Sequence, residues 1–183
     1  QAQDPTTTLS ITSSVANICN GDVITVAVHI ADVMDLYGFD LRMTFDPTVF
    51  EIVSITDGGF LPSPIFTLAN TFDNTNGTLT YAISRYGGGT GANGSGDLLN
   101  INLRVKSPGK TTQFTFVTTE IHPTLLSNSQ AESIPFVIGN TTGAATHACQ
   151  LHFAPNSRIN CTATTIPVRI EDIFDLYGYD VRI

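Results

Sequence analysis

The chain of 183 residues contains no tryptophan, two methionines and three cysteines, and only two of its eight basic residues are lysines. Sixteen acidic residues give a net charge of −8. This balance argues strongly against nucleic acid or an anionic membrane as a partner, because phosphate binding needs a basic surface. No stretch approaches the roughly 18 apolar residues that span a bilayer. Sugar-binding surfaces rely on exposed aromatic rings, so the lack of tryptophan weakens the case for carbohydrate binding. Tyr37, Tyr81 and Tyr86 are the aromatic residues that could take the place of tryptophan in such a surface.

Signatures of catalysis are also missing. There is no Gly-x-Ser-x-Gly motif, and nothing in the sequence places a serine or cysteine beside a base. The glycine-rich stretch 86–96 lacks the Gly-Lys-Ser/Thr ending of a phosphate-binding loop, and we interpret it as a mobile surface loop. Paired carboxylates for glycoside hydrolysis stay open, since any two acidic residues can converge in a fold. We expect a protein that is not an enzyme.

Strand patterns dominate what is present, whereas helical periodicity is not sustained in any window. The clearest pattern is in residues 36–45, where large apolar side chains alternate with Asp40, Arg42 and Thr44. Asp46-Pro47-Thr48 and Asn74-Thr75-Asn76-Gly77 have turn chemistry. We expect strands over residues 8–15, 23–30, 36–45, 49–55, 66–72, 78–84, 97–106, 112–119 and 132–138. About nine short strands separated by turns predict an all-β, antiparallel sandwich.

One segment of the sequence occurs twice. Residues 28–43 recur as residues 168–183, and nine of the sixteen positions are identical. The identical residues are Val28, Ile30, Asp32, Asp35, Leu36, Tyr37, Gly38, Asp40 and Arg42, each repeated 140 residues later. Such a long period corresponds to a whole domain. We therefore predict one complete sandwich in residues 1–148, followed in residues 149–183 by a linker and the first strands of a second repeat.

The first strands of a sandwich cannot bury a core by themselves. We expect the second repeat either to continue beyond Ile183 or to pair with a neighbouring subunit, and both alternatives stay open. In the second case the partner-binding residues would be those of the C-terminal strands. These candidates are Ile166, Val168, Ile170, Leu176, Tyr177, Tyr179, Val181 and Ile183.

Several features point to secretion. The chain begins at Gln1 with no apolar leader, which we interpret as a mature N-terminus left by signal-peptide cleavage. Outside the cell we expect disulfides, and Cys149 is equally suited to pair with Cys19 or with Cys161, with one thiol left over. Four Asn-x-Ser/Thr sequons, which give weaker support, lie at Asn76, Asn93, Asn140 and Asn160.

Two groups of residues resemble metal sites. Asp32, Asp35 and Asp40 carry the oxygen ligands that calcium prefers, but they lack the spacing of a calcium-binding hand. We favour a structural role, in which Asp32 and Asp35 shape a turn between two strands and Asp40 faces solvent. His147-x-Cys149-x-x-His152 has ligands suited to zinc, but no fourth ligand is near, and we interpret this segment as a linker. We expect no cofactor, with calcium as the alternative.

Residues 9–140 resemble a cohesin domain. The resemblance rests on Gly21-Asp22 with Val26 and Val28, on Leu36 to Leu41, on the Phe45-Asp46-Pro47 segment that runs to Val53, and on Gly96 to Val105. It implies a nine-stranded jelly-roll sandwich that binds other proteins, is not catalytic, and belongs to a secreted multi-domain protein. Partners in this family include dockerins, although cohesin-like modules also occur in surface proteins outside cellulosomes.

From these observations we predict a secreted structural or adhesive protein of the cell surface. It would act through protein–protein association of cohesin-like modules, with strand pairing of the C-terminal segment as a route to a filament. A dockerin-binding scaffold module of an extracellular enzyme complex is the alternative. A carbohydrate-binding domain ranks last.

Overall fold

The computed structural model describes residues 6–13, 21–107, 110–119, 121–145, 151–153 and 168–170. All regular elements in these residues are strands, so no helix there could cross a membrane. The strands are β1 (Thr8–Ser13), β2 (Val23–Leu36), β3 (Gly38–Thr44), β4 (Phe50–Asp57), β5 (Ile65–Asp73), β6 (Thr78–Arg85), β7 (Ala92–Val105), β8 (Thr111–Gln113), β9 (Thr115–Phe116), β10 (Leu125–Ser127), β11 (Val137–Ile138), β12 (Thr142–Ala145), β13 (Leu151–Phe153) and β14 (Val168–Ile170).

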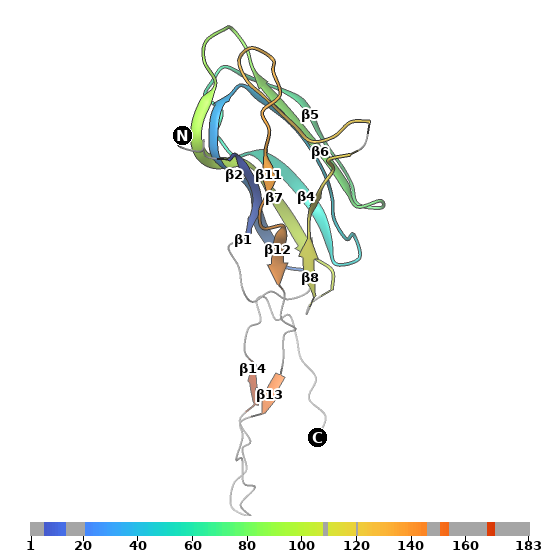
Figure 1. Ribbon diagram of the computed structural model, residues 1–183. Coiled ribbons are helices and arrows are strands. Elements are labelled where there is room, and N and C mark those ends of the chain that lie inside the picture. The colour runs from blue at the N-terminus through green and yellow to red at the C-terminus, as the bar shows by residue number, and fades with distance from the viewer. Residues whose placement is uncertain are drawn as a thin grey trace, which may run out of the picture.

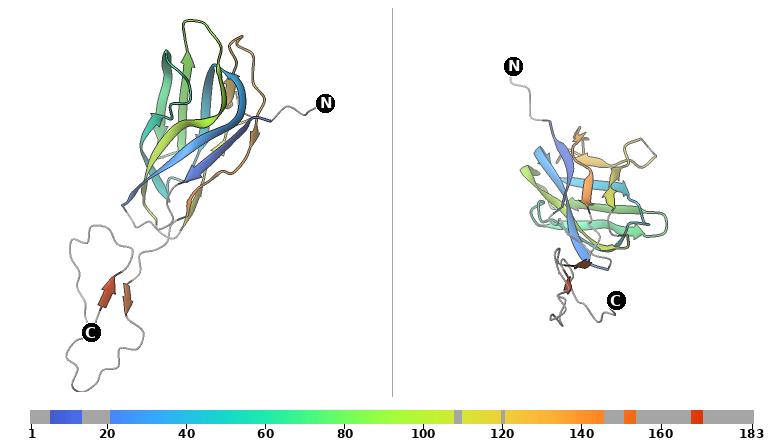
Figure 2. Two further views of the ribbon diagram at one scale, coloured as in Figure 1. Left: turned by 90° about the vertical axis from the view of Figure 1, so that its left-hand side faces the viewer. Right: turned by 90° about the horizontal axis from the view of Figure 1, so that it is seen from below.

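Two sheets pack face to face in the layered arrangement of Figures 1 and 2. The first sheet has the strand order β11-β1-β2-β7-β4, and the second has the order β10-β3-β6-β5, with β9 also paired to β3. Among the strands that the structure describes, the pairing of β11 with β1 is parallel and all others are antiparallel. The predicted all-β sandwich with antiparallel strands is therefore confirmed.

The core lies between the inner faces of the two sheets. Leu41 and Met43 of β3 and Ile101 and Leu103 of β7 all belong to this core, and all four are 1% exposed or less. The aromatic ring of Phe39 stacks on Tyr81, with 6.2 Å between centroids. Alternation along β3 and β7 thus places one side of each strand in the core, as their sequence pattern predicts.

The chain between residues 30 and 36 differs from the expected turn. β2 continues through this region, and Asp32 and Asp35 have positive φ angles of 55° and 58°. The β2–β7 register shifts on both sides of Val33, so the two aspartates mark bulges within the strand. Aspartate tolerates this left-handed conformation better than most residues, which explains the composition of the segment.

Two expected strands are shorter than predicted. The range 112–119 divides into β8, which pairs with β12, and β9, which pairs with β3. Within 132–138 only Val137 and Ile138 pair with β1, while Ser133 forms an isolated bridge. Pro135 has no N–H to donate to a ladder, which limits pairing before Val137.

Side chains close the edge of the first sheet at β4. The amide of Asn74, in the turn after β5, accepts a bond from Ile52 N at 2.8 Å and donates to Ile52 O at 2.9 Å. Asn70 Nδ2 donates to Ile55 O at 3.1 Å. The two asparagines therefore satisfy backbone groups that an open edge strand would leave unpaired.

The last two strands pair with each other. β13 and β14 form an antiparallel two-stranded sheet in which Leu151 faces Ile170 and Phe153 faces Val168. Residues 149–183 were expected to begin a second repeat, and the domain boundary at 148 stays a prediction.

Candidate protein-binding face

The outer surface of the β10-β3-β6-β5 sheet, which we call the open face, consists mainly of short polar side chains. Arg42 of β3 lies opposite Thr80 of β6, and Thr44 lies opposite Thr78. The hydroxyls of these three threonines make no side-chain hydrogen bond within the described residues, so they are available to a partner. A surface of short side chains on paired strands is flat and rigid, which suits contact with another folded surface.

Large apolar side chains border the open face on β5. Phe66 is 60% exposed opposite Ser84, and Leu68 is 64% exposed. The β5–β6 register shifts between Thr67 and Ala69, so Leu68 occupies a bulge and leaves the normal alternation. Exposed neighbours of this size mark an interaction surface more often than isolated apolar residues do.

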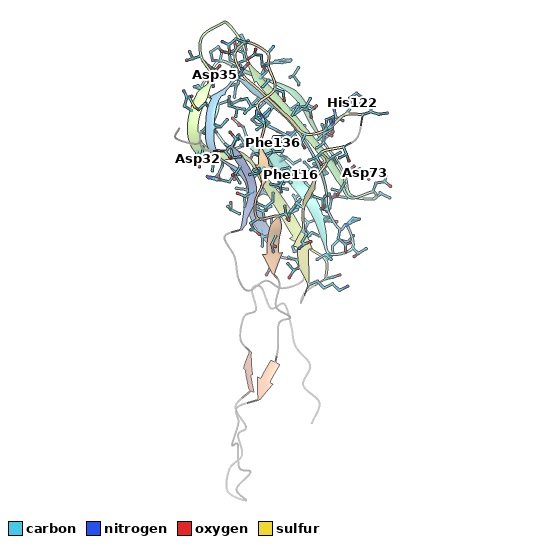
Figure 3. The ribbon with its side chains drawn as sticks, viewed as in Figure 1. Asp32, Asp35, Asp73, Phe116, His122 and Phe136 are labelled. Carbon is cyan, nitrogen blue, oxygen red and sulfur yellow. The ribbon has the colours of Figure 1, made fainter. Side chains whose placement is uncertain are left out.

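A groove lies at the other side of the open face, beneath the segment that follows β9. It has a volume of about 700 Å³ and is lined by residues of β3, β6 and 117–122, including Arg42, Thr80 and Ile121. Val117 N donates to Arg42 O at 2.8 Å, which anchors the start of this segment on β3. Ile121 is 92% exposed beside His122, which projects from the same loop in Figure 3. The groove therefore offers apolar surface together with the polar side chains of β3 and β6.

The charges on the open face are incompletely paired. Arg42 donates from Nη2 to Asp40 Oδ2 at 3.1 Å and from Nε at 3.3 Å. The other carboxylate oxygen, Asp40 Oδ1, is buried and has no hydrogen-bond partner within the described residues. A buried acceptor without a donor costs the module free energy.

The outer surface of the opposite sheet is different, because its polar side chains bond to one another across the strands. Thr25 Oγ1 donates to Asn102 Oδ1 at 2.7 Å, and Asn102 Nδ2 donates to Ser54 Oγ at 2.9 Å. Arg104 pairs with Glu51 at 2.6 Å, and His29 Nδ1 lies 2.8 Å from Asp97 Oδ1. We call these residues the polar ladder: Thr25, His29, Glu51, Ser54, Asp97, Asn102 and Arg104. His29 is half-buried here, and its contact with Asp97 gives it a structural role.

Asp35 holds together the end of the sandwich where β2 stops (Figure 3). Its carboxylate accepts bonds from Ser129 Oγ at 2.7 Å, from Ser129 N at 3.2 Å and from Gly91 N. These hydrogen bonds, chiefly that of the Ser129 hydroxyl, lower the pKa of Asp35 below its usual value. The residue thus joins three separate segments of chain.

The other two predicted calcium ligands have different partners. Asp32 lies beside a smaller groove of about 360 Å³ with Met34 and Phe136, and its N–H is bonded to Ser95 Oγ. Asp40 pairs with Arg42 on the open face. Among the residues that the structure describes, no three His, Cys, Asp or Glu side chains gather in a group suited to a metal. Calcium at Asp32, Asp35 and Asp40 stays a prediction without support from geometry.

The glycine-rich stretch 86–96 is not all loop, because residues 92–96 belong to β7, and Arg85 anchors the part that precedes them. Arg85 Nε donates to Pro62 O at 3.0 Å, its Nη1 donates to Thr90 O, and its guanidinium lies 5.6 Å from the centre of the Tyr37 ring.

Tyr81 is 2% exposed, and burial raises the pKa of its phenol. Of the three tyrosines considered for sugar binding, only Tyr86 is exposed, at 57%.

The three sequons in the described residues differ in the bonds of their amides. Asn76 Nδ2 donates to Asp73 Oδ2 at 2.6 Å, and Asn140 Nδ2 donates to Ile11 O at 3.0 Å. Asn93 is exposed, and only its Oδ1 is engaged, by Asp35 N at 2.9 Å. The amide nitrogen of Asn93 is therefore the one that carries no structural bond within the described chain.

The remaining candidate residues lie outside the described residues. They are Cys19, Cys149, Cys161, Asn160, His147, Ile166, Leu176, Tyr177, Tyr179, Val181 and Ile183. Val168 and Ile170 form part of β14, and His152 lies in β13. The disulfide and partner-binding predictions for these residues stay predictions.

The two packed sheets define an all-β sandwich module with one outer surface that is a candidate for contact with another protein. The cohesin domain family matches residues 7–138, and the chain belongs to this family. No curated protein matches the chain. The resemblance to cohesin domains that the sequence motifs indicated is confirmed.

Solved structures share the fold at low sequence identity. The second type II cohesin module of the cellulosomal adaptor ScaA scaffoldin of Acetivibrio cellulolyticus has a TM-score of 0.63 and 18% identity, over 75% of this chain and 95% of that one. The third cohesin of ScaC from the same organism, solved in complex with the ScaB dockerin, has a TM-score of 0.60 and 20% identity, over 78% and 99%. A non-cellulosomal cohesin from the archaeon Archaeoglobus fulgidus has a TM-score of 0.55 and 14% identity, over 80% and 93%.

Proposed function

We propose that the protein is an extracellular, non-catalytic structural or adhesive protein that acts through protein–protein association. Its partner binds the open face, between the apolar border at Phe66 and Leu68 and the groove beneath residues 117–122. The observation that carries this proposal is the contrast between the two outer surfaces. Side chains of the polar ladder satisfy each other, whereas among the described residues the open face carries threonine hydroxyls without a side-chain bond and the exposed Phe66 and Leu68.

The partner that we favour is another copy of the protein, in a surface filament. The C-terminal segment repeats the opening of the module, and alternating strands of this kind add to an exposed sheet edge of a neighbour through main-chain bonds. A head-to-tail contact between different surfaces does not close and gives a fibre. Residues 149–183 are therefore the proposed donor segment of this assembly.

Association is tested on the purified full chain by sedimentation velocity and by electron microscopy. We expect concentration-dependent assembly into filaments, and a Phe66→Ser, Leu68→Ser double variant should weaken it by about tenfold or more, as truncation of apolar anchors does. Val53→Ser is the matched control, because Val53 is 42% exposed and also sits at the register shift of an edge strand, β4, on the opposite sheet. A monomer at every concentration, or equal effects of both variants, would contradict the proposal.

Dockerin binding is the second candidate function. It is favoured by the cohesin relatives of similar fold that were solved in complex with dockerins. Calorimetric titration with the ScaB dockerin from Acetivibrio cellulolyticus tests it directly. Binding that disappears in the Phe66→Ser, Leu68→Ser variant, in a chain that does not self-associate, would support a scaffold module and argue against a filament.

A further inference from the structure

Strand β5 is a long edge strand whose outer side is open. It has nine residues and stands last in the order β10-β3-β6-β5. Between Phe66 and Phe72 its backbone bonds to β6, and the described chain supplies no partner on the other side. The other sheet ends differ, because Asn70 and Asn74 bond to the backbone of β4, and β10 and β11 are only two or three residues long. Free N–H and C=O groups of an edge strand are a template for another strand.

The sequence of β5 lacks the residues that usually prevent edge strands from pairing. Residues 65–72 contain no charged residue and no proline. Three apolar side chains are exposed instead, at 60% for Phe66, 64% for Leu68 and 39% for Phe72. In a chain with a net charge of −8, an uncharged apolar edge of this kind suits a partner edge that is also uncharged.

The bulge at residue 68 exchanges the two faces of β5. Before the bulge, Phe66 faces outward and Ile65 packs against the core. After it, Thr71 faces outward opposite Thr80, while Asn70 reaches inward to the backbone of β4. Even-numbered residues therefore face outward on one side of the bulge, and odd-numbered residues do so on the other.

Two copies of β5 match these faces in one antiparallel arrangement, in which a two-fold axis passes between Leu68 and Ala69. Opposite residues of an antiparallel pair share a face, so an outward residue must meet an outward residue of the other copy. An axis through a single residue, such as Ala69, would set outward residues against inward ones. With the axis between the two residues, the pairs across the copies are Ile65 with Phe72, Phe66 with Thr71, Thr67 with Asn70, and Leu68 with Ala69.

The side chains of these four pairs are compatible. Two pairs combine an aromatic ring with a β-branched side chain, which is a favourable combination across antiparallel strands. A third pair is polar on both sides, and the fourth joins two apolar residues. The nearest charge, Asp73, lies beyond the last pair and opposite Pro64, so like charges do not meet.

We propose that two copies of the protein pair through β5 about this two-fold axis, so that the β10-β3-β6-β5 sheet continues into the same sheet of the second copy. The contact rests on the proposed self-association and names the strand at which two copies meet. An isologous contact closes after two copies, so it gives a dimer. The head-to-tail contact of a filament then uses a different surface of that dimer.

Charges placed beside the axis test this contact in the full chain. The two copies of Ala69 are near neighbours in the dimer, and the residue is half-buried opposite Ala82. Ala69→Lys and Ala69→Glu each bring two like charges together, so each variant alone should weaken dimerisation in sedimentation velocity by about tenfold or more. An equimolar mixture of the two variants should recover most of the affinity, because only the mixed dimer joins opposite charges.

Val53→Lys and Val53→Glu are the matched controls, because Val53 is 42% exposed on β4 of the opposite sheet. They should leave the dimer unchanged, alone or mixed. If the Ala69 variants associate as the unmodified chain does, the β5 contact is wrong, although assembly through the open face still stands. Weakening by both charges without recovery on mixing would show that another segment occupies β5, and this result also refutes the two-fold pairing. An unmodified chain that stays monomeric refutes both proposals.

A second measurement tests the register without placing a charge in the sheet. Phe66→Cys and Thr71→Cys variants are mixed and oxidised, and mass spectrometry of the linked peptides separates the 66–71 disulfide from 66–66 and 71–71 disulfides by mass. The 66–71 disulfide should predominate by about tenfold or more, because residues 66 and 71 are opposite each other, whereas the two copies of residue 66 are five positions apart along the strand. Equal amounts of the three disulfides would refute a fixed two-fold register at β5.

Discussion

The side-chain hydrogen bonds from Asn70 and Asn74 to the backbone of β4 allow a quantitative prediction about stability. In the variant Asn74→Ala both the N–H and the C=O of Ile52 lose their partners, at a residue that is 2% exposed. An unsatisfied buried group costs about 1–3 kcal/mol, and water reaches this turn in part, because Asn74 itself is only half-buried. We expect a loss of about 3 kcal/mol in the free energy of unfolding, or about 10 °C in melting temperature.

Chemical denaturation with urea measures this loss. Two further variants should lose less free energy of unfolding and so provide a comparison. Asn70→Ala removes one bond to β4 and should cost about 1 kcal/mol, while Thr71→Ala, exposed on the same strand, should cost less than about 0.5 kcal/mol. The order Asn74, Asn70, Thr71 is the result that the geometry requires. If Asn74→Ala were no more destabilising than Thr71→Ala, the two side-chain bonds would contribute nothing, and the closure of this edge would need another explanation.

Two other predictions concern Asp35 and the sequons. Because the pKa of Asp35 is lowered in the fold, its ionised form stabilises the protein at neutral pH, and this contribution disappears as the pH falls through the lowered value. Asp35→Asn should therefore reduce the stability difference between pH 7 and about pH 3 in urea melts, and an unchanged difference would refute the assignment. In a host that glycosylates secreted proteins, mass spectrometry should find Asn93 occupied ahead of Asn76 and Asn140, whose amide nitrogens are already bonded.

Much of the sandwich could be predicted because its central strands are buried on one side only. The alternation in residues 36–45 and 97–106 reports which side chains face the core, and the structure places Leu41 and Ile101 there at 0% exposure. Pairing in β8, β9, β10 and β11 involves two or three residues each. Such short elements have too few positions for a period, and their place depends on neighbours distant in the sequence.

β-Bulges explain most of the remaining differences between the burial expected from the sequence and the burial observed in the structure. In the sequence, Leu98 alternates in step with the polar Asn100 and Asn102, but it is fully buried, because the β2–β7 register shifts between Val28 and His29 and leaves it as the extra residue. Leu68 leaves the alternation of β5 in the same way and becomes exposed. A bulge is set by pairing across strands, so composition alone does not locate it.

The open face was harder to recognise than the fold. Its threonines are ordinary strand residues, and nothing in their spacing separates them from Thr25 in the polar ladder. The difference lies in the neighbours, since Asn102 accepts the hydroxyl of Thr25, whereas Thr80 lies beside Arg42, which Asp40 already engages. Only the register of the sheets reveals this. The apolar pair Phe66 and Leu68 was the one signal available in the sequence, in a strand that otherwise alternates weakly.

The outer surfaces of the two sheets therefore have different roles. The polar ladder contributes to stability, and the open face is proposed to bind the partner. Substitutions in the polar ladder break bonds that already exist within the module, so they should act mainly on folding. Substitutions on the open face remove groups that have no internal partner, so the free chain loses little while a complex loses its contacts. Asp40 is the informative exception, because its Oδ2 is paired with Arg42 within the module. Substitution of Asp40 therefore acts on folding as well as on recognition, whereas substitution of the exposed Thr78 on the same face should act on recognition alone.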